Sequence, residues 1–353
     1  MKKQYAILMA ASILGMAFIG QAEARDQIRI VGSSTVYPFS SYVAEELGAT
    51  TKFRTPVVES TGSGGGMKLF CAGNGMDTPD FTNASRRMKE TEFKMCAENG
   101  VKDITEVVVG YDGIALAQSK GAAPMNLTRH EILLAVAAEV PAKDGSLMAN
   151  PYRYWDEINR NLPHRQIVFY GPPTSSGTRD AFEELTMKNV AKKLPAYTDL
   201  YNADKKKNKK YKKYHEIRQD GVYVPSGEND NLIVQKLVKD KDAIGVFGYS
   251  YLAENIDRIG AITVAGIPPS PESVQDGSYQ LSRSLYFYIK KSHIGKVPGM
   301  KEYINLFTSE QMIGDNGSCT DIGLIALPEE MRDHYRSQAK HLTNLTTGDF
   351  KKK

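Results

Sequence analysis

IRIVGSSTVYP, residues 28–38, passes from an apolar run to small hydroxyl-bearing residues and then to a helix-like pattern. The same order recurs around STGSGGG, residues 60–66, and SSGTRD, residues 175–180. Each stretch is typical of a turn between the end of a strand and the start of a helix, where unpaired backbone N–H groups and the helix dipole can bind an oxyanion. One such turn is an ordinary helix cap. Three in one chain predict an anion cradle.

Strands, glycine-rich turns and helices alternate along the chain, which predicts an α/β fold with parallel, doubly wound sheets. An apolar stretch from 107 to 117 is interrupted by Tyr111-Asp112-Gly113, and this turn-like break suits a hinge between two strands. The expected strands are residues 28–31, 56–59, 107–110, 114–117, 167–169, 243–247 and 283–289, and the expected helices are residues 38–47, 65–71, 179–193, 229–238 and 301–312.

A second unit begins near Leu127, where Thr128 and Glu131 have the spacing of a capping box. The strand expected at 283–289 returns to the first unit. We therefore expect two doubly wound lobes joined by hinge strands. Lobe 1 would comprise residues 25–115 and 255–345, lobe 2 residues 116–254, and residues 346–353 would form a disordered tail.

The first 24 residues have the three parts of a secretory signal peptide. Lys2 and Lys3 precede an apolar run from 7 to 19, and Ala22-Glu23-Ala24 is a cleavage site of the A-x-A type. The run is too short to span a bilayer comfortably. No cysteine follows the cleavage site, so no lipid anchor is expected. These features predict a periplasmic protein that starts at Arg25.

The positive charge of the chain is local. The formal net charge is +4 at pH 7, and seven lysines between Lys205 and Lys213 exceed this total by themselves. A nucleic-acid footprint would instead spread basic residues over a face with aromatic platforms. We interpret the run as a solvated loop and expect no nucleic-acid partner.

Three cysteines remain after residue 24, which in an oxidising compartment indicates one disulfide and one free thiol. Cys71 and Cys96 lie closest in sequence, so we expect them to pair and Cys319 to remain free. The six histidines are scattered without the spacing of metal ligands, so neither a metal site nor a cofactor is expected.

Asp80, in PDFTNASRR, is an acid close in sequence to the second cradle turn. A carboxylate beside an anion makes sense when the ligand carries a proton, because it can accept a hydrogen bond from the P–OH group of phosphate. Sulfate has no such proton at neutral pH, and two acceptors would then face each other. A helix or turn cap is the alternative role for Asp80. Arg86, Arg87 and Arg179 could balance the charge through bidentate hydrogen bonds.

Five motifs in the same order resemble the periplasmic phosphate-binding proteins of the bacterial high-affinity ABC phosphate transporter. They are GSSTVYP, STGSGGG, DFTNASR, SSGTRD and AIGVFGY (residues 243–249), and the resemblance covers nearly the whole chain after residue 24. It implies a type II periplasmic binding protein fold, with two lobes that close on a dehydrated phosphate. It also implies delivery of inorganic phosphate to a membrane ABC permease by a monomer that catalyses no reaction.

The resemblance also implies a set of ligand residues, motif by motif. An arginine often stands four residues before the serine of the SGT element in this family, but that position is Pro172 here. Arg179 is the expected substitute, and Arg86 is the second choice. The expected phosphate-binding residues are Ser34, Thr35, Val36, Ser63, Gly64, Asp80, Arg86, Ser176, Gly177, Thr178 and Arg179.

Two other functions remain open at this stage. A secreted phosphatase or hydrolase could use Ser63 or Ser176 as a nucleophile, but neither serine has a histidine base nearby in the sequence. A binding protein of the same fold could instead take sulfate, molybdate or another oxyanion. Asp80 is the residue expected to favour phosphate.

Overall fold

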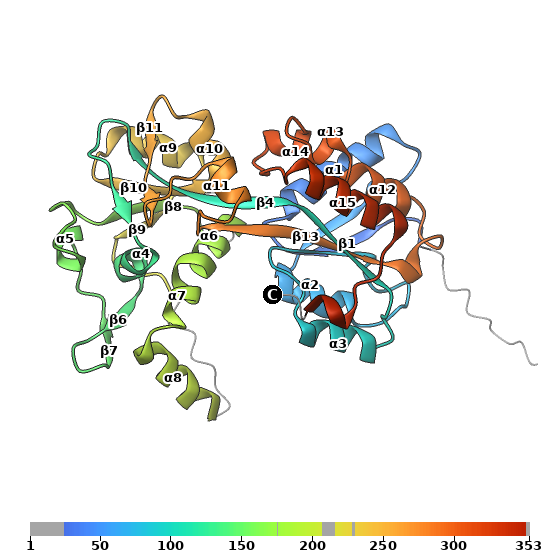
Figure 1. Cartoon of the computed structure of the whole chain (residues 1–353), viewed down its shortest axis with the longest axis horizontal. Helices are drawn as coiled ribbons and strands as arrows, with labels where there is room; N and C mark the ends of the chain where they lie inside the picture. Colours follow the sequence, from blue (N-terminus) through green and yellow to red (C-terminus); the bar gives the residue numbers. More distant parts are fainter. Residues whose placement is uncertain (1–24, 175, 207–215, 228–229, 351–353) are drawn as a thin grey trace, which may run out of the picture.

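The computed structural model describes residues 25–174, 176–206, 216–227 and 230–350. Two α/β lobes lie side by side, and two long strands run from one to the other (Figure 1). The predicted signal peptide, residues 1–24, and most of the lysine run lie outside the described residues.

Lobe 1 contains the first two cradle turns. Its strands run in the order β2-β1-β3, all parallel, and each is followed by a turn and a helix, so the predicted alternation is confirmed here. Helices from the C-terminal part of the chain cover the same lobe (Figure 1). The elements are β1 (Arg29–Gly32), α1 (Tyr37–Thr50), β2 (Val57–Ser60), α2 (Gly62–Phe70), β3 (Phe81–Ala84), α3 (Glu90–Glu98), α12 (Met300–Phe307), α13 (Glu310–Ile313), α14 (Ser318–Asp321) and α15 (Glu329–His341).

Lobe 2 contains the third turn. Its strands β10, β8 and β9 are mutually parallel, and Thr128 and Glu131 form the predicted capping box. The elements are β5 (Asn126–Leu127), α4 (Arg129–Val136), β6 (Glu139–Pro141), β7 (Leu147–Ala149), α5 (Trp155–Ile158), β8 (Val168–Gly171), α6 (Gly177–Phe182), the π-helical turn η1 (Glu183–Lys188), α7 (Asn189–Ala191), α8 (Pro195–Lys206), β9 (Tyr223–Pro225), α9 (Asn231–Lys239), β10 (Ala243–Gly248), α10 (Tyr249–Glu254), β11 (Ile259–Ala261), β12 (Thr263–Val264) and α11 (Pro271–Gln275).

Two strands, β4 (Ile104–Ser119) and β13 (Ser282–Lys290), connect the lobes. The part of β4 up to Gly113 pairs with β13, and the part from Ile114 onward pairs with β10 of lobe 2. The predicted break at Tyr111-Asp112-Gly113 was therefore wrong, because one strand continues through it. The exchange of partners between Gly113 and Ile114 still places the junction of the lobes at that point.

The second boundary lies later than predicted. β11 pairs with the lobe 2 end of β4, and Val264, Tyr279 and Leu281 pack in the lobe 2 core. Residues 259–281 thus belong with lobe 2, and the chain returns to lobe 1 through β13 rather than at residue 255. The chain therefore crosses from lobe 2 to lobe 1 within strand β13 and not in a loop.

The C-terminal segment is ordered further than predicted. Thr347–Phe350 forms a 3₁₀ turn, and the ring of Phe350 lies 5.3 Å from that of Phe93. The guanidinium of Arg87 lies 5.7 Å from the same ring. The predicted tail therefore packs on lobe 1 up to Phe350, and residues 351–353 lie outside the described part.

The disulfide joins Cys71, at the end of α2, to Cys96 in α3. Cys319 is buried with a free thiol, as expected. Burial raises the pKa of that thiol, so it stays protonated and unreactive at neutral pH.

Candidate functional site

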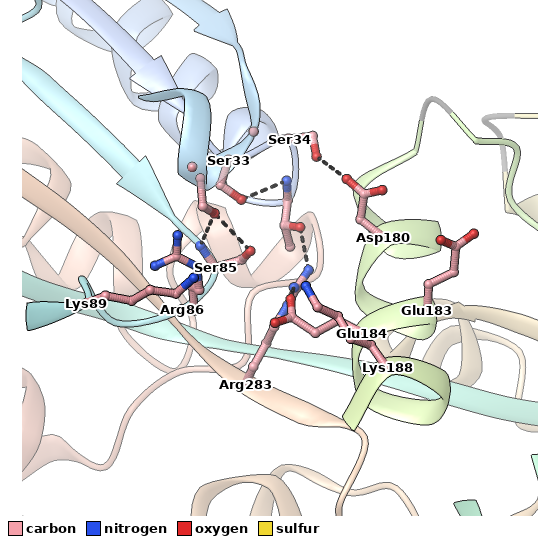
Figure 2. A pocket seen from close by; sticks show the side chains of 14 residues that line it. Ser33, Ser34, Ser85, Arg86, Lys89, Asp180, Glu183, Glu184, Lys188 and Arg283 are labelled. Atoms are coloured by element: carbon pink, nitrogen blue, oxygen red, sulfur yellow. Dashed lines mark hydrogen bonds and ion pairs between the residues drawn. The ribbon is translucent and has the colours of Figure 1, made fainter. Parts of the chain in front are cut away.

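A cavity of about 350 Å³ lies between the lobes, at the carboxyl ends of β1, β2 and β3 (Figure 2). This edge is where open parallel sheets hold their ligands. The residues that line the cavity are Ser33, Ser34, Thr35, Gly62, Ser63, Gly64, Ser85, Arg86, Lys89, Asp180, Glu183, Glu184, Lys188 and Arg283.

Two helices of lobe 1 start at this cavity without a side-chain cap. α1 follows Val36 and α2 follows Thr61, and neither of these side chains accepts a hydrogen bond from its helix. The first N–H groups of a helix have no partner within the helix and can bind an anion. In α1 the N–H of Tyr37 already donates to the Ser33 carbonyl and Pro38 has no N–H, so the start of α2 is the better anion site. Residues 62–64 bring the start of α2 into the cavity wall.

Glycine allows α2 to approach β1 this closely. A Cβ atom on Gly66 would lie 2.5 Å from the Cα of Gly32, which real Cβ contacts do not allow. Gly32 itself has φ +132° and would place a Cβ atom 2.1 Å from the backbone oxygen of Asn83. The glycines of the first two motifs thus allow the backbone packing that brings the start of α2 to the cavity.

Serine hydroxyls cover the rest of the lobe 1 wall. The Ser63 hydroxyl accepts a hydrogen bond from the backbone N–H of Ser85 at 3.1 Å and lies 3.3 Å from the Ser85 hydroxyl. The Ser33 hydroxyl accepts from the backbone N–H of Thr35 at 3.2 Å. Hydroxyl groups can donate to or accept from a ligand, which suits an anion that also carries a proton.

Arg283 reaches the cavity from β13, the strand that joins the lobes (Figure 2). Its Nη2 donates to the Thr35 hydroxyl of lobe 1 at 2.6 Å, and its Nη1 lies 3.5 Å from the carboxylate of Glu184 in lobe 2. Its Nε lies 3.3 Å from Asp112 in β4. The side chain is only 9% exposed, so this cation contacts both lobes and both connecting strands.

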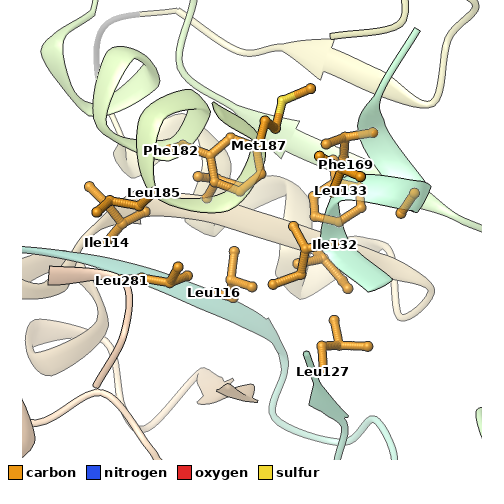
Figure 3. Close-up of a cluster of buried hydrophobic side chains, with 14 of the residues drawn as sticks. Ile114, Leu116, Leu127, Ile132, Leu133, Phe169, Phe182, Leu185, Met187 and Leu281 are labelled. Atoms are coloured by element: carbon orange, nitrogen blue, oxygen red, sulfur yellow. The ribbon is translucent and has the colours of Figure 1, made fainter. Parts of the chain in front are cut away.

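Lobe 2 supplies a wall of acids from one continuous helical segment, α6 and η1. Phe182 and Leu185 of this segment pack in the lobe 2 core, which also contains Phe169 of β8 (Figure 3). The opposite face carries the carboxylates of Asp180, Glu183 and Glu184 toward the cavity (Figure 2). The amphipathic pattern of this segment fixes which residues meet the ligand space.

The lobes touch beside the cavity. A Cβ atom on Gly177 would lie 2.6 Å from the backbone nitrogen of Thr35, so the two turns are in backbone contact. The Thr35 hydroxyl donates to the carbonyl of Gly177 at 3.3 Å. Ser176 caps its own helix by accepting from the backbone N–H of Thr178. The cavity lining does not include Ser176, Gly177, Thr178 or the buried Val36.

Asp80 does not reach the cavity, which corrects the expectation from the sequence. It precedes β3, whereas the cavity lies beyond the other end of that strand, roughly 16 Å away at the rise of an extended chain. Its buried carboxylate pairs with Arg25, accepts from the backbone N–H of Arg29 at 2.8 Å, and lies 2.7 Å from Nδ1 of His293. Asp80 is a buried structural group of lobe 1.

Arg179 also faces away from the cavity. Its Nε donates to Glu183 at 2.6 Å, and its guanidinium lies 4.2 Å from the ring centre of Tyr223 in the lobe 2 interior. The side chain is 7% exposed and does not line the cavity. The i, i+4 ion pair with Glu183 holds Arg179 against its own helix. Arg179 therefore does not lie where the substitute for the missing ligand arginine was expected.

Arg86, the second choice, does line the cavity, directly after Ser85. Its two terminal nitrogens bind the carboxylate oxygens of Glu92 at 2.9 and 2.7 Å. That ion pair raises the pKa of Arg86 and fixes the orientation of its guanidinium group. Arg86 therefore contributes positive charge to the cavity wall, but Glu92 already occupies the two nitrogens that could bind a ligand side by side.

The sequence contained signals for the residues that were missed. Ser85 stands directly after a strand that is parallel to β1, in the same relation to its strand as Ser33. Arg283 continues the alternating series Leu285, Phe287 and Ile289, so it shares their inward face although it is charged. A charged side chain at Arg283, on a strand face that is otherwise apolar and buried, was the signal of a binding site.

The described residues contain no group of three or more acids, cysteines or histidines that could hold a metal ion. They also contain no helix long and apolar enough to cross a membrane.

Comparisons with known proteins agree with this geometry. A family model described as a PBP superfamily domain matches residues 20–311. Protein SphX of Synechocystis sp. is 28% identical over 329 residues, covering 91% of this chain and 84% of that protein. The phosphate-binding protein PstS of Staphylococcus saprophyticus is 27% identical, covering 96% of this chain and 90% of its own.

Solved structures show the same architecture. A possible phosphate binding protein from Planctomyces limnophilus is similar with a TM-score of 0.68 and 27% identity, covering 90% of this chain and 99% of that one. An ABC-type phosphate transport receptor from Vibrio cholerae has a TM-score of 0.58 at 18% identity, covers 86% of this chain and all of its own, and supports the fold alone. These relatives are binding proteins and transport receptors rather than enzymes. The chain therefore belongs to the PBP superfamily, with the type II periplasmic binding protein fold.

Proposed function

We propose that this chain captures inorganic phosphate between its two lobes in the periplasm and delivers it to the membrane permease of an ABC transporter. Residues 1–24 would be the signal peptide, and the mature protein would act as a monomer without a cofactor. The observation that carries the proposal is the interlobe cavity, which combines the uncapped start of α2, serine hydroxyls and a cation that contacts both lobes. The names of the relatives supply the ligand class.

The binding mode follows from the groups in the wall. The N–H groups of residues 62–64 and the hydroxyls of Ser34, Ser63 and Ser85 would donate to phosphate oxygens from lobe 1. Arg283 would supply the positive charge in place of Arg179, with phosphate oxygens replacing its present contacts to Thr35 and Glu184. Most donors are neutral dipoles fixed by the fold, so they can replace water around the anion without extensive reorganisation.

The contact between Thr35 and Gly177 explains how delivery could work. The two turns meet at the mouth of the cavity, so a bound anion is enclosed when they touch and released when they separate. Movement at the junction in β4 and β13 would open this contact, as in other two-lobed receptors that close by a hinge. A permease that holds the lobes apart would then receive the phosphate.

Substitution of Arg283 tests this binding mode. Arg283→Lys keeps the charge but cannot reproduce a planar fork, so phosphate affinity measured by calorimetry should fall at least tenfold. Arg179→Lys is the matched control, because that guanidinium faces the interior of lobe 2. Equal affinities in the wild type and Arg283→Lys would remove Arg283 from the ligand set, and absence of phosphate binding in the wild type would overturn the proposed function.

A further inference from the structure

The interlobe cavity extends beyond the donors proposed for phosphate. Its volume of about 350 Å³ equals that of roughly a dozen water molecules in the liquid. From Asp180 the lobe 2 wall continues for eight residues to Lys188, which is roughly 10 Å of helix. Lys89 reaches the cavity from lobe 1. A single tetrahedral anion held by residues 62–64 and Arg283 would therefore leave this part of the cavity to solvent.

Lys89 and Lys188 extend into the cavity from opposite lobes (Figure 2). In the described part of the chain, neither ammonium group has a carboxylate within 4 Å. Glu92 and Glu184, three and four residues away in the sequence, are each paired with an arginine instead, at 2.7 and 3.5 Å. Two positive charges without ion-pair partners thus face each other across the junction of the lobes.

Lys192 shows that these charges act on one another between the lobes. It lies one turn beyond Lys188, and partial removal from water together with Lys188 and Lys89 lowers its pKa, although Glu184 opposes the shift. Because Lys89 belongs to lobe 1, closure of the lobes concentrates positive charge in this part of the cavity. An anionic group between Lys89 and Lys188 would relieve that repulsion.

Resting on the proposed function, we propose that the same cavity also binds condensed phosphates, of which pyrophosphate is the smallest. One phosphoryl group would occupy the donors at residues 62–64 and Arg283, and the second would lie between Lys89 and Lys188. An ammonium group is a point charge with three rotatable donors, so it can bind a terminal phosphoryl group without a fixed orientation. Orthophosphate fills only the first of these two places.

A cationic entrance could also attract anions without holding them. Long-range attraction of this kind raises the association rate of every anion and weakens with added salt. A lysine that contacts the second phosphoryl group instead changes the affinity for pyrophosphate relative to that for phosphate. The ratio of the two affinities, measured in one salt solution, therefore separates binding from attraction.

Calorimetric titration of residues 25–353 with phosphate and with pyrophosphate, in the absence of divalent cations, tests the proposal. The wild type should bind one pyrophosphate per chain at least as tightly as phosphate, and saturating phosphate should suppress that binding. Lys188→Met keeps an apolar stem but removes the charge, so pyrophosphate affinity should fall at least tenfold and phosphate affinity less than about threefold. Lys89→Met should have the same effect from the other lobe.

Lys193→Met is the matched control. It removes one positive charge from an exposed position just after α7 that does not line the cavity. Both affinities should stay within about twofold of the wild type, because solvent and salt screen a charge at that position. Thermal melting checks that each variant is folded.

The outcomes distinguish the two proposals. A wild type that binds phosphate but not pyrophosphate would overturn this inference and leave the proposed function intact. The same holds if saturating phosphate leaves pyrophosphate binding unchanged, or if both lysine variants lower the two affinities by equal factors. If the wild type binds neither anion, both proposals fail.

Discussion

Lys290 is the residue whose burial has the most direct consequence for stability. Its side chain is fully buried, where the ammonium donates to the carbonyl of Gly73 and the hydroxyl of Thr78 and lies 5.0 Å from the ring centre of Phe70. Burial lowers its pKa from 10.5 to about 8, although the nearby Asp80 opposes the shift. The folded protein therefore loses this proton at a lower pH than the unfolded chain.

The sign of the effect on stability follows from that difference. Below pH 8 both states of the chain hold the proton, and between pH 8 and 10 the unfolded chain holds it while the folded protein has lost it. The free energy of unfolding should then rise by roughly 2 kcal/mol from pH 8 to 10. Urea unfolding at fixed pH values would measure the rise, and Lys290→Met should abolish it. A wild-type stability that falls across this interval would contradict the assignment.

Asp80 shows why the ligand residues could be predicted only in part. The sequence places Asp80 near a cradle turn. Whether that acid lies at the cavity end or the far end of its strand depends on where β3 begins. A shift of five positions separates the buried Asp80 from Ser85 at the cavity. The turns themselves were found because their small residues are required by local backbone geometry, which does not depend on distant contacts.

At the scale of elements, the glycines of the second motif make a testable pair. A Cβ atom on Gly66 would clash with β1, whereas one on Gly65 would meet only Thr61, at 3.5 Å. Both positions lie inside α2, where alanine is intrinsically preferred over glycine by about 0.5–1 kcal/mol.

Gly66→Ala should lower the free energy of unfolding by about 1–3 kcal/mol, because overpacking against backbone cannot relax easily. Gly65→Ala should leave it unchanged or raise it slightly. Denaturant unfolding of the two variants side by side measures the difference. If Gly66→Ala is as stable as Gly65→Ala, the close packing of α2 on β1 is not required.

Helices and strands were predicted well where a short run of residues determines them, and less well where a distant contact does. Strands β1, β2, β8 and β10 and the capping box at Thr128 followed from runs of a few residues. β4 was divided wrongly, because Asp112 interrupts its apolar pattern. The structure explains the polar residue by its ion pair with Arg283 from a strand 171 positions later in the sequence, a contact that local pattern cannot reveal.

At the scale of the whole molecule, the contact between Thr35 and Gly177 should control closure. Alanine at 177 would place a methyl group against the backbone of residues 34 and 35, so the lobes could not meet. Small-angle scattering should show that phosphate compacts the wild type but not Gly177→Ala, whose phosphate affinity should fall at least tenfold.

Gly260→Ala in lobe 2 is the control, since a Cβ atom there meets nothing within 4 Å. It should close on phosphate like the wild type. Full compaction of Gly177→Ala would show that the lobes close through other surfaces.

The division into lobes was predicted from the order of elements, and the crossing strands explain the remaining error. Residues 259–281 follow lobe 2 because β11 pairs with the end of β4. Sheet partners of this kind are set by the whole fold, so the composition of the segment gave no sign of them. The family match and the two-lobed architecture nevertheless lead to the same account of a receptor that encloses its ligand.

The central claim is that the interlobe cavity binds one phosphate per chain, and calorimetric titration of residues 25–353 with inorganic phosphate tests it most directly. The account predicts saturable binding of one phosphate per chain. An absence of phosphate binding would contradict it.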